Sequence, residues 1–136
     1  MEKLFHFDCP REVYQADACV ISCFDARFDL PLRKFLKRRG IALYDHVKIP
    51  GSAKALGAPD RESDRDFVLT MVRTSLRLHG PNRLLLFAHN DCGAYPDIPA
   101  EIVAADVVKA VEFMRTAEPS LPCESYFCDF DGIYGI

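Results

Sequence analysis

The sequence lacks the features that define several classes of protein. No apolar run approaches the roughly 20 residues that a membrane-spanning helix needs, and there is no internal repeat, low-complexity tract or linker. The formal net charge is -3, with 17 Lys and Arg against 20 Asp and Glu. The most basic stretch, residues 34–39, falls on a predicted amphipathic helix, where a solvated face is the simpler interpretation. We therefore expect neither a membrane nor a nucleic acid as partner.

The beginning of the chain also lacks a secretory signal. Met1-Glu2-Lys3 is followed by no apolar signal core, which predicts a cytoplasmic protein. The length of 136 residues favours a single domain. With 49% hydrophobic and 27% charged residues, that domain can bury a core.

The cysteines indicate a metal site rather than disulfides. Six cysteines in a chain without a secretory signal favour metal ligation or plain burial. Cys23 and Cys92 lie inside local patterns with chemical meaning. We expect the other four to be buried or half-buried: Cys9, Cys19, Cys123 and Cys128. No Cys-x-x-Cys pair is present, so a thiol redox function ranks last.

Hydrophobic periodicity predicts strands and helices in alternation. Residues 1–17 would form an arm with one helical turn after Pro10, and residues 18–136 a single domain. Strands are predicted at 18–23, 42–49, 83–88, 125–130 and 133–136, and helices at 30–39, 62–79 and 100–116. Ser63 is the predicted N-cap of the second helix, and Asp131-Gly132 the two-residue turn of a final hairpin.

This order of elements predicts an α/β fold. Alternation of strand and helix favours a mostly parallel central sheet flanked by helices, and the last hairpin adds an antiparallel edge. In such sheets, ligands bind beyond the carboxyl ends of the strands. That rule singles out two loops, the ones that follow Ser22 and Ala88.

These two loops contain the residues of a zinc site. Cys23 opens the first, and His89 and Cys92 lie in the second. Two thiolates and one imidazole form a ligand set that zinc prefers, and three protein ligands leave the fourth position of a catalytic zinc open. Gly93 would let the turn continue without a Cβ conflict. The alternative is that both cysteines are buried thiols and His89 is a core histidine.

A carboxylate and a guanidinium follow the first cysteine. In an extended segment, Asp25 and Arg27 would share a face and pair beside the metal. Asp25 could then either occupy the fourth zinc position or turn to Arg27 and accept a hydrogen bond from zinc-bound water. A bidentate Arg27 would keep Asp25 ionised in the second pose.

These motifs resemble the β-class carbonic anhydrases. The resemblance rests on residues 23–27 (Cys-Phe-Asp-Ala-Arg) and 88–94 (Ala-His-Asn-Asp-Cys-Gly-Ala), with support from 48–52 (Lys-Ile-Pro-Gly-Ser) and 126–132 (Tyr-Phe-Cys-Asp-Phe-Asp-Gly), and covers residues 18–136. It implies a β-carbonic-anhydrase-like fold and a homodimer or multiple of dimers. It also implies one Zn²⁺ per chain on Cys23, His89 and Cys92, and an Asp25–Arg27 dyad. Zinc-bound hydroxide would then convert carbon dioxide to bicarbonate.

The sequence departs from that family at several positions. Lys48 and Ile49 stand where the family usually has Arg and Asn, and Ala88 replaces the usual Gly. Lys cannot reproduce a planar bidentate clamp. We place Ile49, Gly51 and Gly93 in the substrate pocket. These departures keep two alternatives open: a non-catalytic zinc-binding or bicarbonate-sensing interaction protein, and a hydrolase of a carbon dioxide analogue such as carbonyl sulfide or carbon disulfide.

Overall fold

The protein folds around one five-stranded sheet. The computed structural model describes residues 1–136. Its strands are β1 (Ala18–Ser22), β2 (Tyr44–Lys48), β3 (Leu84–His89), β4 (Cys123–Cys128) and β5 (Ile133–Gly135). Its helices are the 3₁₀ helix η1 (Ala26–Phe28), α1 (Asp29–Arg38), α2 (Lys54–Gly57), α3 (Glu62–His79) and α4 (Ala100–Ala117). No helix is both long enough and apolar enough to cross a membrane.

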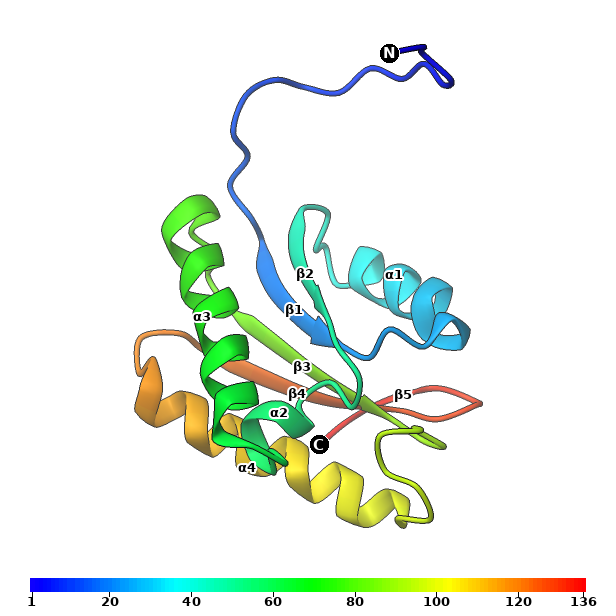
Figure 1. Ribbon diagram of the computed structural model, residues 1–136, viewed down its shortest axis with the longest axis vertical. Helices are drawn as coiled ribbons and strands as arrows, with labels where there is room; N and C mark the ends of the chain where they lie inside the picture. Colours follow the sequence, from blue (N-terminus) through cyan, green and yellow to red (C-terminus); the bar gives the residue numbers. More distant parts are fainter.

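The strand order confirms the predicted fold class. The sheet runs β2-β1-β3-β4-β5; its first four strands are parallel, and β5 pairs antiparallel to β4. The two central strands, β1 and β3, are buried along their whole length, as expected for continuous apolar runs covered on both faces. They are neighbours that run in the same direction (Figure 1), so their carboxyl ends point toward the same edge of the sheet.

Helices cover both faces of the sheet. On one face, α1 buries Leu32 and Leu36 against Val20, Leu85 and other residues of β1 and β3. On the other face, α2, α3 and α4 enclose the larger core with side chains such as Leu56, Val72 and Met114. Gly57 packs so closely on α4 that an added Cβ would lie 1.9 Å from the carbonyl oxygen of Asp106.

Three local expectations are wrong. Helix α3 begins at Glu62 after Arg61, so Ser63 lies inside its first turn and is not the N-cap. The hairpin loop has four residues, 129–132, because β4 pairs with β3 from Cys123 to Cys128 and ends before Asp129. Cys9 is exposed, whereas Cys19 and Cys128 are buried and Cys123 is half-buried as expected.

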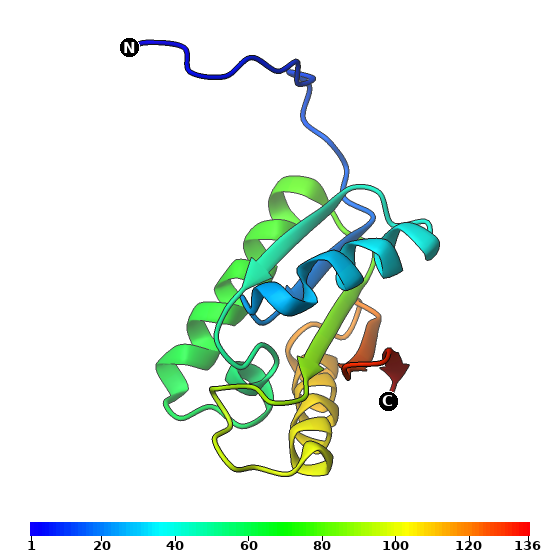
Figure 2. The same cartoon turned by 90° about the vertical axis from the view of Figure 1, so that its right-hand side faces the viewer.

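The first residues of the chain extend away from the sheet. Residues 1–15 are exposed and contain no helix, so the turn expected after Pro10 is absent. A short isolated turn has an unfavourable nucleation free energy, and here no packing compensates for it. The arm meets the body at Tyr14, whose hydroxyl donates to Asp45, and at Ala16, whose N–H donates to the carbonyl of His79. Figures 1 and 2 show the remainder projecting from the molecule.

Candidate metal centre

The structure brings the three predicted ligands together at the carboxyl end of the sheet. Cys23 directly follows β1, His89 is the last residue of β3, and Cys92 lies three residues further along the same loop. Their ligand atoms all lie within 4.8 Å of one another. Adjacent parallel strands bring this about, because β1 and β3 pair in register and end at the same edge. The Cys-His-Cys cluster can bind a metal ion.

The imidazole of His89 is prepared for a ligand. Its Nδ1 lies 2.7 Å from the carbonyl oxygen of Asn90, so Nδ1 carries the proton and Nε2 presents a lone pair. His89 is 4% exposed, and Nε2 has no hydrogen-bond partner. A buried polar atom without a partner is costly, and a metal ion coordinated by Nε2 would remove that cost. The ring is held by Phe28, with ring centroids 4.6 Å apart.

The two sulfurs differ in charge when no metal is bound. The Cys92 thiol donates to the Cys23 sulfur, which lowers the pKa of Cys23 to about 4 and raises that of Cys92. The backbone N–H of Gly51 faces both sulfurs and favours their thiolate forms. Gly51 has a φ of +71°, and a Cβ there would lie 2.9 Å from the Cβ of Ala94. Glycine is therefore required where the loop after β2 meets the cluster.

Asp25 and Arg27 form an ion pair next to the cluster. Arg27 Nη2 lies 2.6 Å from Asp25 Oδ2, and Arg27 Nε lies 3.0 and 3.1 Å from its two oxygens. This bidentate pair lowers the pKa of Asp25 to about 2. The two residues meet because Asp25 caps η1 and accepts from the Arg27 N–H at 3.0 Å. The pairing was predicted, but the extended segment invoked for it is wrong.

A third residue that sequence reasoning missed joins the pair. Asp91 Oδ2 accepts from Nη1 of Arg27 at 2.9 Å. Asp91 also has a positive φ, 53°. Gly93 is exposed, has no positive φ and has open space where its Cβ would lie, so the expected steric need for glycine there is wrong. The position of Asp91 inside the His-x-x-Cys motif was the available signal.

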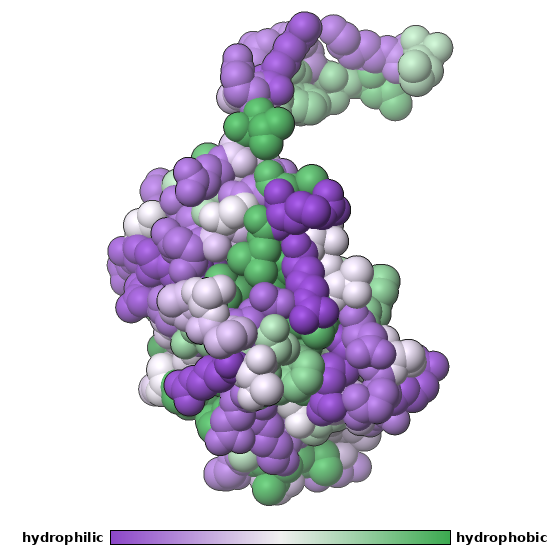
Figure 3. Space-filling model, turned by 90° about the vertical axis from the view of Figure 1, so that its left-hand side faces the viewer, coloured by the Kyte–Doolittle hydropathy of each residue, from purple (hydrophilic) through white to green (hydrophobic).

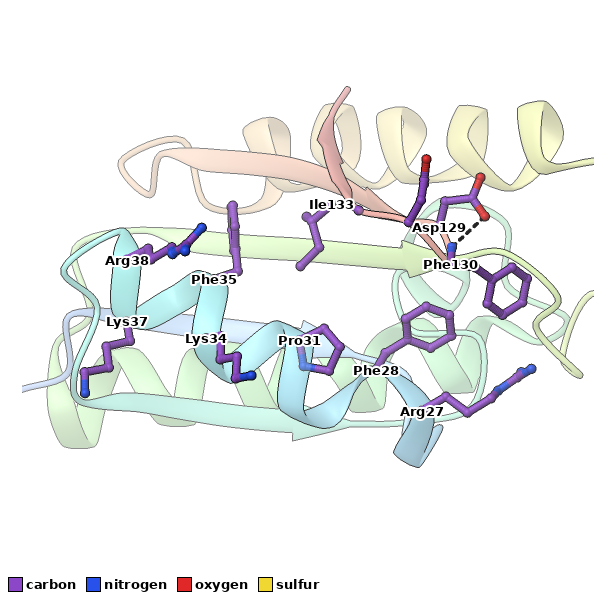
Figure 4. A pocket seen from close by; sticks show the side chains of 12 residues that line it. Arg27, Phe28, Pro31, Lys34, Phe35, Lys37, Arg38, Asp129, Phe130 and Ile133 are labelled. Carbon is purple, nitrogen blue, oxygen red and sulfur yellow. Dashed lines mark hydrogen bonds between the residues drawn. The ribbon is translucent and has the colours of Figure 1, made fainter.

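Two cavities lie near the centre, and neither is lined by Cys23, His89 or Cys92 themselves. Ile49 lines one of about 320 Å³ together with Lys54, Phe67 and Ala94. A wider groove of about 900 Å³ runs between α1 and the β4–β5 hairpin, with Arg27 at one end. Figure 4 shows Arg27, Phe28 and Phe130 grouped there. Lys48 forms an ion pair with Asp29 at the start of α1, so it does not act as a clamp on either cysteine loop.

A family model described as "putative carbonic anhydrase" matches residues 14–133, nearly the whole chain. The chain belongs to this family. No curated protein matches the sequence. Solved carbonic anhydrases share the fold at low identity. The carbonic anhydrase from Streptococcus mutans has a TM-score of 0.67 at 14% identity, covering 96% of this chain and 88% of that one. The β-carbonic anhydrase isoform I of Trichomonas vaginalis has a TM-score of 0.66 at 10% identity, covering 96% of this chain and 87% of that one. The carbonic anhydrase of Glaciozyma antarctica has a TM-score of 0.60 at 16% identity, covering 91% of this chain and 84% of that one.

Membership of the carbonic anhydrase family agrees with the chemistry of the cluster. The family usually uses zinc, and two sulfurs with one imidazole nitrogen are ligands that zinc prefers. The fit rests on this chain's own atoms, since the unpartnered Nε2 of His89 points to a ligand independently of any relative.

Proposed function

We propose that this protein is a zinc-dependent carbonic anhydrase, a lyase that interconverts carbon dioxide and bicarbonate. The observation that carries the proposal is the buried, unpartnered Nε2 of His89 beside two cysteine sulfurs. Family membership supports the same reaction. We assign Cys23, His89 and Cys92 as the ligands of one zinc ion per chain, which leaves one position open.

Bound zinc would supply an activated water molecule, whose pKa falls to about 7 at such sites. The protein's contribution is to direct that water. Asp25 is ionised across the neutral pH range, because Arg27 holds its pKa far below 7. Its carboxylate therefore accepts a hydrogen bond from the reacting water and orients it toward carbon dioxide.

The substrate is small and apolar, and we assign its pocket to residues beside the cluster. Ile49 supplies an apolar wall between the core and the smaller cavity. Gly51 contributes its backbone, because a side chain there would collide with Ala94. Gly93 is exposed and leaves the approach to Cys92 open.

We further propose that residues 1–17 act as an arm of the 18–136 domain and that the protein forms a homodimer or a multiple of dimers. The arm exposes Leu4, Phe5, Phe7 and Val13, each at least 70% exposed. Apolar side chains grouped on a projecting segment favour association. Figure 3 shows apolar atoms on the arm and in a band on the body below it. Light scattering at micromolar concentration tests this, and a monomer would contradict it.

Stopped-flow hydration of carbon dioxide by zinc-loaded protein tests the activity. We expect hydration by wild type and none above background by Cys92→Ser. Absence of hydration with about one zinc per chain would overturn the proposal in favour of a non-catalytic zinc protein. Release of sulfide from carbonyl sulfide or carbon disulfide, without hydration, would instead assign the analogue hydrolase.

A further inference from the structure

Arg27 is bound from two loops that lie far apart in the sequence. Its Nε and Nη2 face Asp25, while Nη1 donates to Oδ2 of Asp91 at 2.9 Å and Nη2 to the carbonyl oxygen of Asp91 at 3.1 Å. The donors of a guanidinium are arranged at fixed angles in one plane. Acceptors on two of its edges therefore determine the orientation of the whole group.

Asp91 is itself held in place. Its backbone is in the left-handed region at φ 53°, which Asp and Asn tolerate better than most residues. Its N–H donates to the side-chain oxygen of Asn90 at 2.8 Å. The Nδ2 of Asn90 donates in turn to Asp129 at 3.0 Å, which ties the loop to the β4–β5 hairpin.

Aromatic rings limit the remaining freedom of Arg27. Its Cζ lies 5.7 Å from the ring centroid of Phe28 and 5.7 Å from that of Phe130 (Figure 4). Both distances suit a cation–π contact. The side chain of Arg27 is still 48% exposed, so without Asp91 its Nη1 edge would face water and the group could turn outward.

We propose that Asp91 is a positioning residue, which holds Arg27 so that the Nε–Nη2 edge faces Asp25. The expected effect on kcat rests on the proposed function, whereas the expected effect on the orientation of Arg27 does not. Since Asp25 is oriented by Arg27, Asp91 controls the direction of the Asp25 carboxylate without touching it. The loop after β3, which carries Asp91 and Cys92, would thereby determine how Asp25 and Arg27 are oriented after β1.

Two substitutions at Asp91 and one control test this. Asp91→Gly removes the carboxylate and suits the positive φ, so backbone strain does not confuse the result. Asp91→Asn keeps an acceptor oxygen and the same backbone preference. Asp97→Gly is the control, because Asp97 lies in the same loop, is exposed and has a φ of 57°. Solvent exchange of the Arg27 Nε–H by NMR, zinc content, kcat and KM are measured for each.

We expect Asp91→Gly to speed Arg27 Nε–H exchange and lower kcat by about two- to fivefold, the range of an exposed ion pair, with KM and zinc content unchanged. Asp91→Asn should bring the Arg27 Nε–H exchange rate and kcat most of the way back to their wild-type values, and Asp97→Gly should match wild type in both. Unchanged Arg27 exchange in Asp91→Gly, or an equal change in Asp97→Gly, would overturn the proposal. If wild type shows no hydration, the proposed function fails, and the exchange measurement still decides the role of Asp91.

Discussion

The two ends of the sheet carry similar residues in different environments. At the carboxyl end, His89 is buried and its Nε2 has no partner. At the amino end, His79 binds Asp45 through Nδ1 at 2.8 Å and stacks on Tyr14, with ring centroids 4.2 Å apart. Asp45 also accepts from Ser75 at 2.5 Å. His79 thus joins α3 and the arm to the sheet, while His89 is left with a lone pair for a metal.

The cysteines show the same contrast. Cys19 in β1 is fully buried, and burial raises the pKa of its thiol to about 11. Cys23 lies four residues further on, where the Cys92 hydrogen bond lowers its pKa to about 4. Hydrogen-bond donors at the strand end, rather than residue type, therefore distinguish Cys23 from the core thiol of Cys19.

The largest expected effect comes from removing a ligand sulfur. Cys23→Ser or Cys92→Ser should lose most of the zinc and also lower the free energy of unfolding, because metal binding energy adds to folding energy. Cys19→Ala is the matched control at the other end of the sheet and should retain about one zinc per chain. Elemental analysis and chemical denaturation measure both quantities. Full zinc retention in the two serine variants would refute the ligand assignment.

The dyad should have the next largest effect. Asp25→Ala and Arg27→Ala should lower kcat by about 10- to 100-fold, the usual range for groups that orient a metal site, with zinc content unchanged. Arg27→Lys should retain only part of the wild-type kcat, since the single ammonium group of Lys cannot hold a carboxylate in a fixed orientation as a bidentate guanidinium does.

The control for the dyad is an ion pair of Arg with a carboxylate away from the centre. Arg73 of α3 and Glu118, which follows α4, make such a pair, with Nε 2.6 Å from Oε1. Arg73→Ala should leave stopped-flow rates unchanged. Wild-type rates in Asp25→Ala or Arg27→Ala would show that the dyad is structural.

Thiol alkylation should separate the cysteine classes by rate. In zinc-loaded protein, iodoacetamide should modify exposed Cys9 first, and Cys19 only after unfolding. A chelator should speed modification of Cys23 by about tenfold or more, because the metal no longer occupies the thiolate. Peptide mass spectrometry follows each site. Equal rates at Cys23 with and without chelator would argue against a sulfur-bound metal.

The smallest effect concerns the arm. The hydrogen bond to Asp45 raises the pKa of Tyr14 to about 12, against an ordinary value of 10. The folded state therefore holds this proton more tightly. The stabilisation is fully present below pH 10 and is lost as the pH rises from 10 to 12.

Denaturation at pH 9 and pH 11.5 should accordingly show wild type more stable than Tyr14→Phe at the lower pH only. Tyr44→Phe removes a hydroxyl that makes no hydrogen bond and should show no such pH dependence. A difference between wild type and Tyr14→Phe that is the same at both pH values would contradict the proposed role of the Tyr14 proton.

Local patterns in the sequence determined much of the fold. Continuous apolar runs predicted β1 and β3, and helical spacing predicted α3 and α4 to within a residue or two. Strand–helix alternation implied a parallel sheet, which placed the loops of Cys23 and His89 at the same edge, and the pairing of β1 with β3 then brings the two residues together. These inferences succeed because period, turn residues and strand direction are properties of short segments.

Only the tertiary structure decided the contacts around the cluster. Arg27 and Asp91 are 64 positions apart, and nothing local to either indicates that a guanidinium would join two loops. The Gly51 N–H reaches both sulfurs because the loop after β2 folds back over the strand ends. His79 is the last residue of the helix predicted at 62–79, and its ring binds Asp45 of β2, a contact that the helix pattern does not indicate. Such contacts depend on how the elements pack in three dimensions. A hydrogen bond forms only within a narrow range of donor–acceptor distances, so shifts of a few tenths of an ångström in that packing decide which groups become partners.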